Sequence, residues 1–119
     1  MTGLIENMFI MPLLVGLVFV ITSIITHRFP PGKINYLYGY RTNRSMKSQD
    51  RWDFAQKYSS RRMHEAGLAL IAVSFTGFAL PLSAEVKFWL GILPAILSCV
   101  YIFNKTEKAL RQHFPESES

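Results

Sequence analysis

Three uncharged apolar runs alternate with polar segments along this chain of 119 residues, and they cover residues 8–26, 66–83 and 88–103. As a helix that rises about 1.5 Å per residue, the first run is roughly 28 Å long, close to the hydrocarbon thickness of a bilayer. The third would reach only about 24 Å, but its ends carry the interfacial aromatic residues Trp89 and Tyr101. The pattern predicts an all-α, polytopic membrane protein with three transmembrane helices.

Composition agrees with this interpretation, because half of the residues (50%) are hydrophobic and they are grouped rather than spread. A removable signal peptide is the competing interpretation of the first run. However, the residues before it, MTGLIEN, contain no Lys or Arg, and no small-residue cleavage site precedes the basic residues His27 and Arg28. We therefore expect the first run to be a retained span.

The basic residues predict an orientation. Nine of the 13 Lys and Arg residues lie between His27 and Met63, and three follow the third run. Only Lys87 lies between the second and third runs, where its side chain can extend to the lipid head groups. Since Lys and Arg near span ends stay in the cytoplasm, we expect the N-terminus outside, with the loop 29–62 and the polar tail 104–119 inside.

Small and polar residues recur at helical spacing on one side of each run. The three sets are Pro12, Gly16, Phe19, Ser23 and Thr26; Gly67, Leu70, Ser74, Gly77 and Pro81; and Gly91, Ala95, Ser98 and Ile102. Small residues let helix backbones approach closely in a membrane, so these faces are predicted to pack together. The alternative is a polar pathway lined by the hydroxyl groups. The faces of the helices that point away from the bundle are expected to contact lipid or another subunit, in a homo-oligomer or a hetero-complex.

The loop 29–62 is predicted to contain a helix of its own. Pro30 and Pro31 cannot extend the first helix, and Ser48 is a suitable N-cap for a new one. We expect an amphipathic interfacial helix over residues 49–61 that leads into the second span, with Trp52 at head-group depth.

Several kinds of chemistry lack a signature in the sequence. It has no Cys/His metal-ligand spacing, no glycine-rich phosphate loop and no nucleophile elbow, and the single cysteine, Cys99, cannot form an internal disulfide. We therefore expect no metal, no cofactor and no catalytic residue. The net charge of +5 is accounted for by orientation and by anionic lipid head groups, so we expect no nucleic-acid partner.

The segment NYLYGYRTNRSMKSQDRW resembles the signature loop of the SdpI family of small bacterial membrane proteins. The residues that carry the resemblance are Asn35, Gly39, Tyr40, Arg41, Thr42, Ser45, Ser48 and Trp52. The resemblance extends over roughly residues 29–103, and it implies a multi-pass protein of the bacterial cytoplasmic membrane. The founding member gives Bacillus cells immunity to a secreted toxic peptide and binds a transcriptional repressor; it has additional N-terminal spans that this sequence lacks.

These loop residues form the predicted binding site: Asn35, Gly39, Tyr40, Arg41, Thr42, Ser45 and Trp52. Arg41 has a planar, permanently charged group that suits a carboxylate or phosphate, and Gly39 permits a close approach of the backbone. An antimicrobial peptide, a lipid or a regulatory protein would suit such a site. The alternative is structural, with Arg41 paired to helix carbonyls or to Asp50 or Asp53.

His64 and Glu65 suggest a second function, a small membrane enzyme or transporter component that acts with Arg41 on a lipid or peptide. The zinc motif H-E-x-x-H is incomplete, because position 68 is Leu68. We expect His64 and Glu65 to contact Arg61 or Arg62 instead. The two functions differ in whether His64 and Glu65 converge on Arg41.

Overall fold

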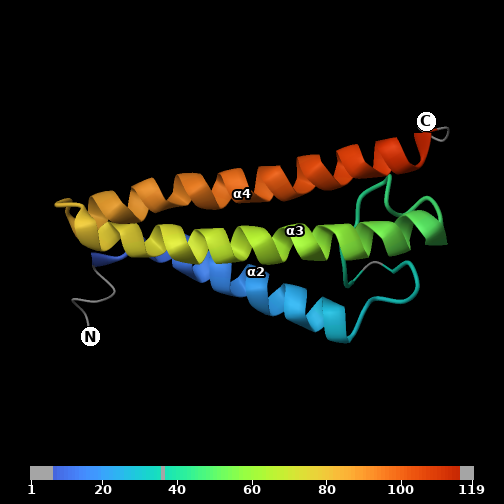
Figure 1. The fold of residues 1–119 in the computed structure, drawn as a ribbon, viewed down its shortest axis with the longest axis horizontal. Coiled ribbons are helices and arrows are strands. Elements are labelled where there is room, and N and C mark those ends of the chain that lie inside the picture. The colour runs from blue at the N-terminus through green and yellow to red at the C-terminus, as the bar shows by residue number, and fades with distance from the viewer. Residues whose placement is uncertain (1–6, 36, 116–119) are drawn as a thin grey trace.

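The computed structural model describes residues 7–35 and 37–115, which form a bundle of long helices (Figure 1). Its elements are α2 (Ile10–Arg28), α3 (Gln49–Phe75), the short 3₁₀-helix η1 (Thr76–Ala79) and α4 (Ala84–His113), with no β-strand in the described part of the chain. The all-α class is therefore confirmed. In Figure 1, α3 lies between α2 and α4, and the loop after α2 lies at the same end of the bundle as the C-terminal end of α4.

Among the described residues, α2 and α4 are long and apolar enough to cross a membrane. Large apolar side chains on their outer faces are exposed, such as Val18 and Leu93, each 58% exposed. The bundle is 52 Å long. With 27 and 30 residues, α3 and α4 are about 40 and 45 Å long, more than the roughly 30 Å core of a bilayer. The first part of α3 and the last part of α4 are polar, and they lie at the loop end.

The helix that starts at Gln49 begins as predicted but does not end as predicted. The Ser48 hydroxyl caps it by accepting a hydrogen bond from the Arg51 amide at 3.2 Å. The helix then continues without a break into the second apolar run and ends at Phe75. The predicted end of this helix at residue 61 is therefore wrong, because the connecting sequence RRMHEA contains neither Pro nor Gly and consists mostly of good helix formers.

The expected polar tail also begins as helix, since α4 continues through His113. This extension brings residues 104–113 alongside the first turns of α3. Phe54 stacks on His113 with ring centroids 4.5 Å apart, and the guanidinium of Arg51 lies 5.0 Å from the Phe114 ring centroid. The polar ends of α3 and α4 are thus held together at the loop end of the bundle.

The predicted small-residue faces do pack together. A Cβ atom on Gly16 would lie 2.7 Å from the Gly67 carbonyl oxygen, and one on Gly67 would lie 2.8 Å from the Gly16 carbonyl oxygen, so α2 and α3 are in backbone contact there. The hydroxyl groups of Ser74 and Ser98 donate to carbonyl oxygens of their own helices, at 2.5 and 2.7 Å. They are satisfied locally, which favours packing over a polar pathway.

Lys87 is not placed as expected. Its side chain is only 2% exposed, and its ammonium group donates to the carbonyl oxygen of Asn7 at 3.4 Å. Nearby, a Cβ atom on Gly91 would lie 2.7 Å from Pro12 Cδ, so the start of α4 packs tightly against the start of α2. Lys87 extends across this end of the bundle because a backbone acceptor is available there.

Candidate functional site

The loop 29–48 leaves α2 at Pro30 and Pro31 and turns sharply at Asn35. The Asn35 side-chain oxygen accepts the amides of Leu37 and Tyr38, at 2.9 and 2.7 Å, and its amide group donates to the Lys33 carbonyl oxygen at 2.9 Å. All of these bonds are local, so Asn35 shapes the turn.

Gly39 lets the loop lie directly against α3. Its φ angle is +107°, the left-handed region that favours glycine, and a Cβ atom there would lie 2.6 Å from the Gln56 side-chain oxygen. That oxygen accepts the Tyr40 amide at 2.7 Å, while the Gln56 amide group donates to the Tyr40 carbonyl oxygen at 2.8 Å. The buried Gln56 thus pairs with both backbone groups of Tyr40.

Glu107 of α4 binds the same stretch of loop from the other side. Its carboxylate accepts hydrogen bonds from the Tyr40 hydroxyl at 2.6 Å, the Thr42 hydroxyl at 2.8 Å and Arg44 Nε at 3.2 Å. The residue is only 8% exposed. A buried carboxylate needs such donors, since its desolvation is otherwise costly. We call Gln56 and Glu107 with their loop partners the loop clamp.

Electrostatics reinforce the bond between the loop and α4. Burial raises the pKa of the Tyr40 phenol well above its usual range, and the adjacent Glu107 carboxylate raises it further by accepting the phenolic proton in a hydrogen bond. Tyr40 is therefore a hydrogen-bond donor at any physiological pH.

Thr42 and Ser45 close the tip of the loop. The Ser45 hydroxyl oxygen accepts the Thr42 amide at 2.9 Å, and the Thr42 hydroxyl oxygen accepts the Ser45 amide at 3.1 Å. Ser45 is fully buried. This reciprocal turn points the Thr42 hydroxyl group toward Glu107.

Trp52 joins the loop to the start of α3. It is 0% exposed, and its indole N–H donates to the Pro31 carbonyl oxygen at 2.8 Å. A loop carbonyl satisfies the indole N–H, so the ring is covered by protein and does not face lipid head groups directly. Gln49 adds a second bond to this junction, from its amide group to the Gly32 carbonyl oxygen at 2.5 Å.

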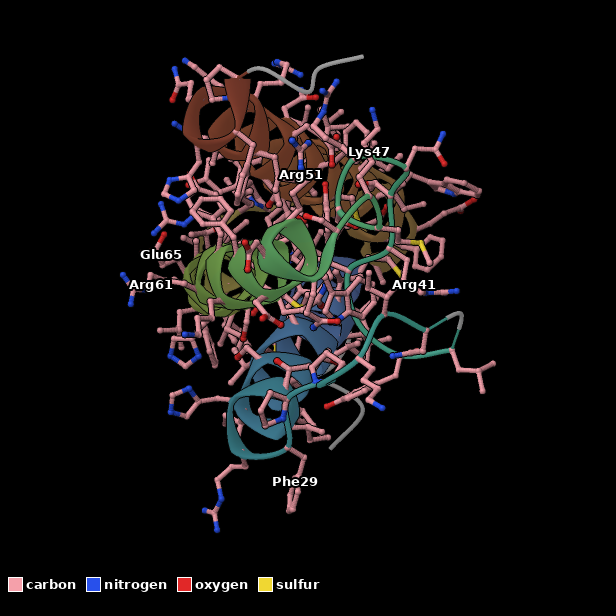
Figure 2. The ribbon with its side chains drawn as sticks, turned by 90° about the vertical axis from the view of Figure 1, so that its right-hand side faces the viewer. Phe29, Arg41, Lys47, Arg51, Arg61 and Glu65 are labelled. Carbon is pink, nitrogen blue, oxygen red and sulfur yellow. The ribbon has the colours of Figure 1, made fainter. Side chains whose placement is uncertain are left out.

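Arg41 is the predicted site residue that is left on the surface. Its neighbours Tyr40 and Thr42 are turned to Glu107, whereas Arg41 is exposed on one side of the bundle (Figure 2). The arginine that reaches the buried carboxylate is Arg44. The loop clamp therefore fixes the backbone on both sides of Arg41.

His64 and Glu65 do not join this site. Glu65 pairs with Arg62 at 3.0 Å, as predicted, and His64 Nδ1 lies 3.1 Å from the Ser23 hydroxyl oxygen on α2. Figure 2 shows Glu65 on the side of the bundle opposite Arg41. Within residues 7–35 and 37–115, no group of three or more His, Cys, Asp or Glu residues could hold a metal ion.

A known protein family matches the loop and most of the two helices that follow it. The SdpI/YfhL protein family matches residues 32–104, which is more than half of the chain. The chain belongs to this family. Over 96 residues it is 38% identical to a protein named "Uncharacterized protein YfhL" from Bacillus subtilis (strain 168). The aligned region covers 81% of this chain and 82% of that protein. No solved structure matches.

The SdpI/YfhL match includes every loop residue that the sequence singled out, and it also includes Arg44 and Gln56. It ends at residue 104, just before Glu107. Sequence reasoning missed Glu107, Arg44 and Gln56 as site residues. The available signal was weak: Glu107 is the one acidic residue in the basic stretch NKTEKALRQH.

Proposed function

We propose that this SdpI/YfhL family member is a non-enzymatic protein of the bacterial cytoplasmic membrane that recognises a peptide or a regulatory protein through the loop 29–48. Recognition would serve toxin immunity or signalling. The observation that carries the proposal is the loop clamp: Glu107 and Gln56 bind Tyr40 and Thr42 and leave Arg41 exposed between them.

A loop that is already ordered loses little conformational entropy when it binds, so more of the contact energy contributes to affinity. The guanidinium of Arg41 presents several N–H donors in a plane and suits a carboxylate, such as a peptide C-terminus or an acidic side chain. A peptide or protein partner can supply such a carboxylate to the loop.

Membrane placement is part of the same proposal. The second apolar run, which forms the last part of α3 and η1, supplies the third crossing between α2 and α4. The loop and the end of α4 then lie in the cytoplasm, where their Lys and Arg residues are retained. Lipid, or a second copy of the chain, covers the exposed apolar faces of α2 and α4.

Cysteine labelling tests this orientation. In a Cys99→Ser background, Ser83→Cys before α4 should react with an impermeant maleimide on intact cells, and Asn43→Cys in the exposed loop should react only after permeabilisation. Reaction of Asn43→Cys on intact cells would place the loop outside and refute the cytoplasmic assignment.

The alternative of a membrane enzyme or transporter component requires Arg41, His64 and Glu65 to act together. Glu65 is paired with Arg62 and lies across the bundle from Arg41, and His64 contacts Ser23 (Figure 2). This separation disfavours a shared substrate site.

Exposure of cells to secreted antimicrobial peptides tests the function itself. Cells that produce the protein should survive at least one such peptide better than cells that lack it, and Glu107→Ala at equal membrane abundance should remove the advantage. A survival advantage that Glu107→Ala retains in full would separate immunity from the loop. Absence of protection, and of any change in gene expression under peptide challenge, would refute both proposed roles.

A further inference from the structure

A second polar site lies on the other side of the bundle, between the end of α2 and the middle of α3. It is a cavity of about 570 Å³, within the usual range of ligand sites. Its lining residues are Ser23, Ile24, Thr26, His27, Arg28, Pro30, Gln56, Lys57, Ser60, Arg61 and His64. Figure 2 shows Arg61 on the side opposite Arg41, so the basic part of this cavity and the exposed Arg41 lie on different sides of the bundle, with the buried Gln56 bordering both the cavity and the loop.

The charge of the cavity is uniformly positive. Arg28, Lys57 and Arg61 line it, and no Asp or Glu does. Within the described residues, none of these three side chains forms an ion pair. The nearby acidic residue Glu65 is paired with Arg62. Arg28, Lys57 and Arg61 are exposed, and together they give this cavity a positive potential that no acidic lining residue offsets, so the lining favours an anionic ligand.

The inner wall of the cavity is a network of hydroxyl groups. The Thr26 and Ser60 hydroxyl oxygens lie 2.9 Å apart, and the Ser60 hydroxyl donates to the Ser23 carbonyl oxygen at 3.3 Å. His64 Nδ1 lies 3.1 Å from the Ser23 hydroxyl oxygen. These bonds hold α2 and α3 together at the inner end and keep polar groups facing the cavity.

The surface beside the cavity is apolar. Ile24 lines the cavity, and along the same helix Ile21 and Ile25 are 55% and 45% exposed. The cavity lies at the end of α2, where the basic residues of its last turn succeed the apolar run. It thus combines a cationic polar part with an adjacent apolar helix face, the two surfaces that a phospholipid requires.

We propose that this cavity binds the head group of an anionic phospholipid. Arg28, Lys57 and Arg61 contact the phosphate, and the acyl chains lie along the exposed isoleucines of α2. Basic pockets between transmembrane helices on the cytoplasmic side are suited to such head groups. The proposal rests on the membrane placement given above, but it does not depend on what the loop recognises.

Lipid retention by the purified full-length protein tests this proposal. The protein in mild detergent is mixed with phosphatidylglycerol or phosphatidylcholine, and bound lipid is counted by native mass spectrometry. The parent should retain phosphatidylglycerol in preference to phosphatidylcholine. Lys57→Gln/Arg61→Gln should bind it about 30-fold more weakly, since each basic residue near an anionic surface contributes about a factor of five.

Two further variants separate the site from general effects of charge and folding. Arg111→Gln removes a charge from the exposed surface of α4 and should retain the parent's affinity. Lys57→Arg/Arg61→Lys exchanges the two cations and should keep most of the binding. Loss of binding in this exchanged variant, with helix content unchanged in circular dichroism, would show that charge at the cavity is not what binds the lipid.

Two outcomes would overturn the proposal. Equal retention of phosphatidylglycerol by the parent and by Lys57→Gln/Arg61→Gln would show that the lipid binds elsewhere. Complete displacement of the lipid by millimolar inorganic phosphate would identify a site for a free anion. Neither result depends on the peptide challenge, so failure of lipid binding and failure of recognition by the loop can be told apart. The two proposals share only the membrane placement, which the cysteine labelling tests separately.

Discussion

Replacing Glu107 by Ala should release the loop from α4 without unfolding the helices. The carboxylate is the shared acceptor for Tyr40, Thr42 and Arg44, whose donor atoms lie 2.6 to 3.2 Å away. Alanine is a strong helix former, so α4 itself should persist. The perturbation therefore acts on one junction.

The size of the effect follows from the three bonds. A hydrogen bond to a charged group contributes about 1.5–3 kcal/mol. The two hydroxyl donors regain water when the loop opens, and the Arg44 side chain is already 26% exposed, so its bond counts as a surface ion pair of at most about 1 kcal/mol. The Tyr40 hydroxyl keeps the Phe103 carbonyl oxygen, 3.5 Å away, as a second acceptor, so only the Thr42 bond counts in full. We therefore expect Glu107→Ala to make loop opening easier by about 2–4 kcal/mol, or at least about 30-fold in the open population.

Limited proteolysis in detergent measures this population. The loop contains trypsin sites at Lys33, Arg41, Arg44 and Lys47, and cleavage follows the open fraction when opening and closing are fast. Cleavage within the loop should be at least about 30-fold faster in Glu107→Ala than in the parent.

Glu65→Ala is the matched control, because Glu65 is an acidic residue in an exposed ion pair with Arg62. Its loop cleavage should equal that of the parent. If Glu107→Ala is cleaved no faster than Glu65→Ala, the carboxylate does not hold the loop and the loop clamp is refuted.

Three further predictions concern packing, backbone and titration. Gly67→Val should lower the thermal midpoint in detergent by several degrees, because its Cβ would lie 2.8 Å from a carbonyl oxygen of α2, whereas Ala69→Val on the exposed face of α3 should change it little; equal shifts would refute the close contact. Gly39→Ala should speed tryptic cleavage of the loop, and Gly32→Ala, whose Cβ would meet nothing within 4 Å, should not. The phenol of Tyr40 should ionise at higher pH than an ordinary tyrosine, so the loop loses stability as pH rises above about 10, the usual phenol pKa; phenolate absorbance that titrates identically in Tyr40→Phe, apart from its amplitude, would contradict this.

Local features of the fold could be predicted from the sequence. Ser48 caps α3 and the small-residue faces pack, because capping and helical spacing depend on residues within a few positions of each other. The positions of Trp52 and Lys87 could not be predicted in the same way. An aromatic residue such as Trp52 can have the same neighbours in sequence whether it faces lipid head groups or is covered by a loop. The same is true of a lysine such as Lys87, whether it reaches head groups or a distant carbonyl oxygen.

The site was only partly predictable for a related reason. The residues of the loop were identified, but their partner Glu107 is 67 positions from Tyr40 and lies in a stretch that is typical of a solvated tail. Only the continuation of α4 to His113 brings that carboxylate to the loop. The structure also revised the roles within the loop: Tyr40, Thr42 and Ser45 hold it in place, and Arg41 is left exposed.

The central claim is that the clamped loop recognises a partner through Arg41, and Arg41→Lys tests it most directly. Lysine keeps the charge but loses the planar set of donors. Protection or signalling, compared at equal membrane abundance, should fall to near the level of cells without the protein in Arg41→Lys and should be unchanged in Arg111→Lys, on the exposed surface of α4. Full activity of Arg41→Lys would contradict the account and leave the loop as a basic segment at the membrane surface.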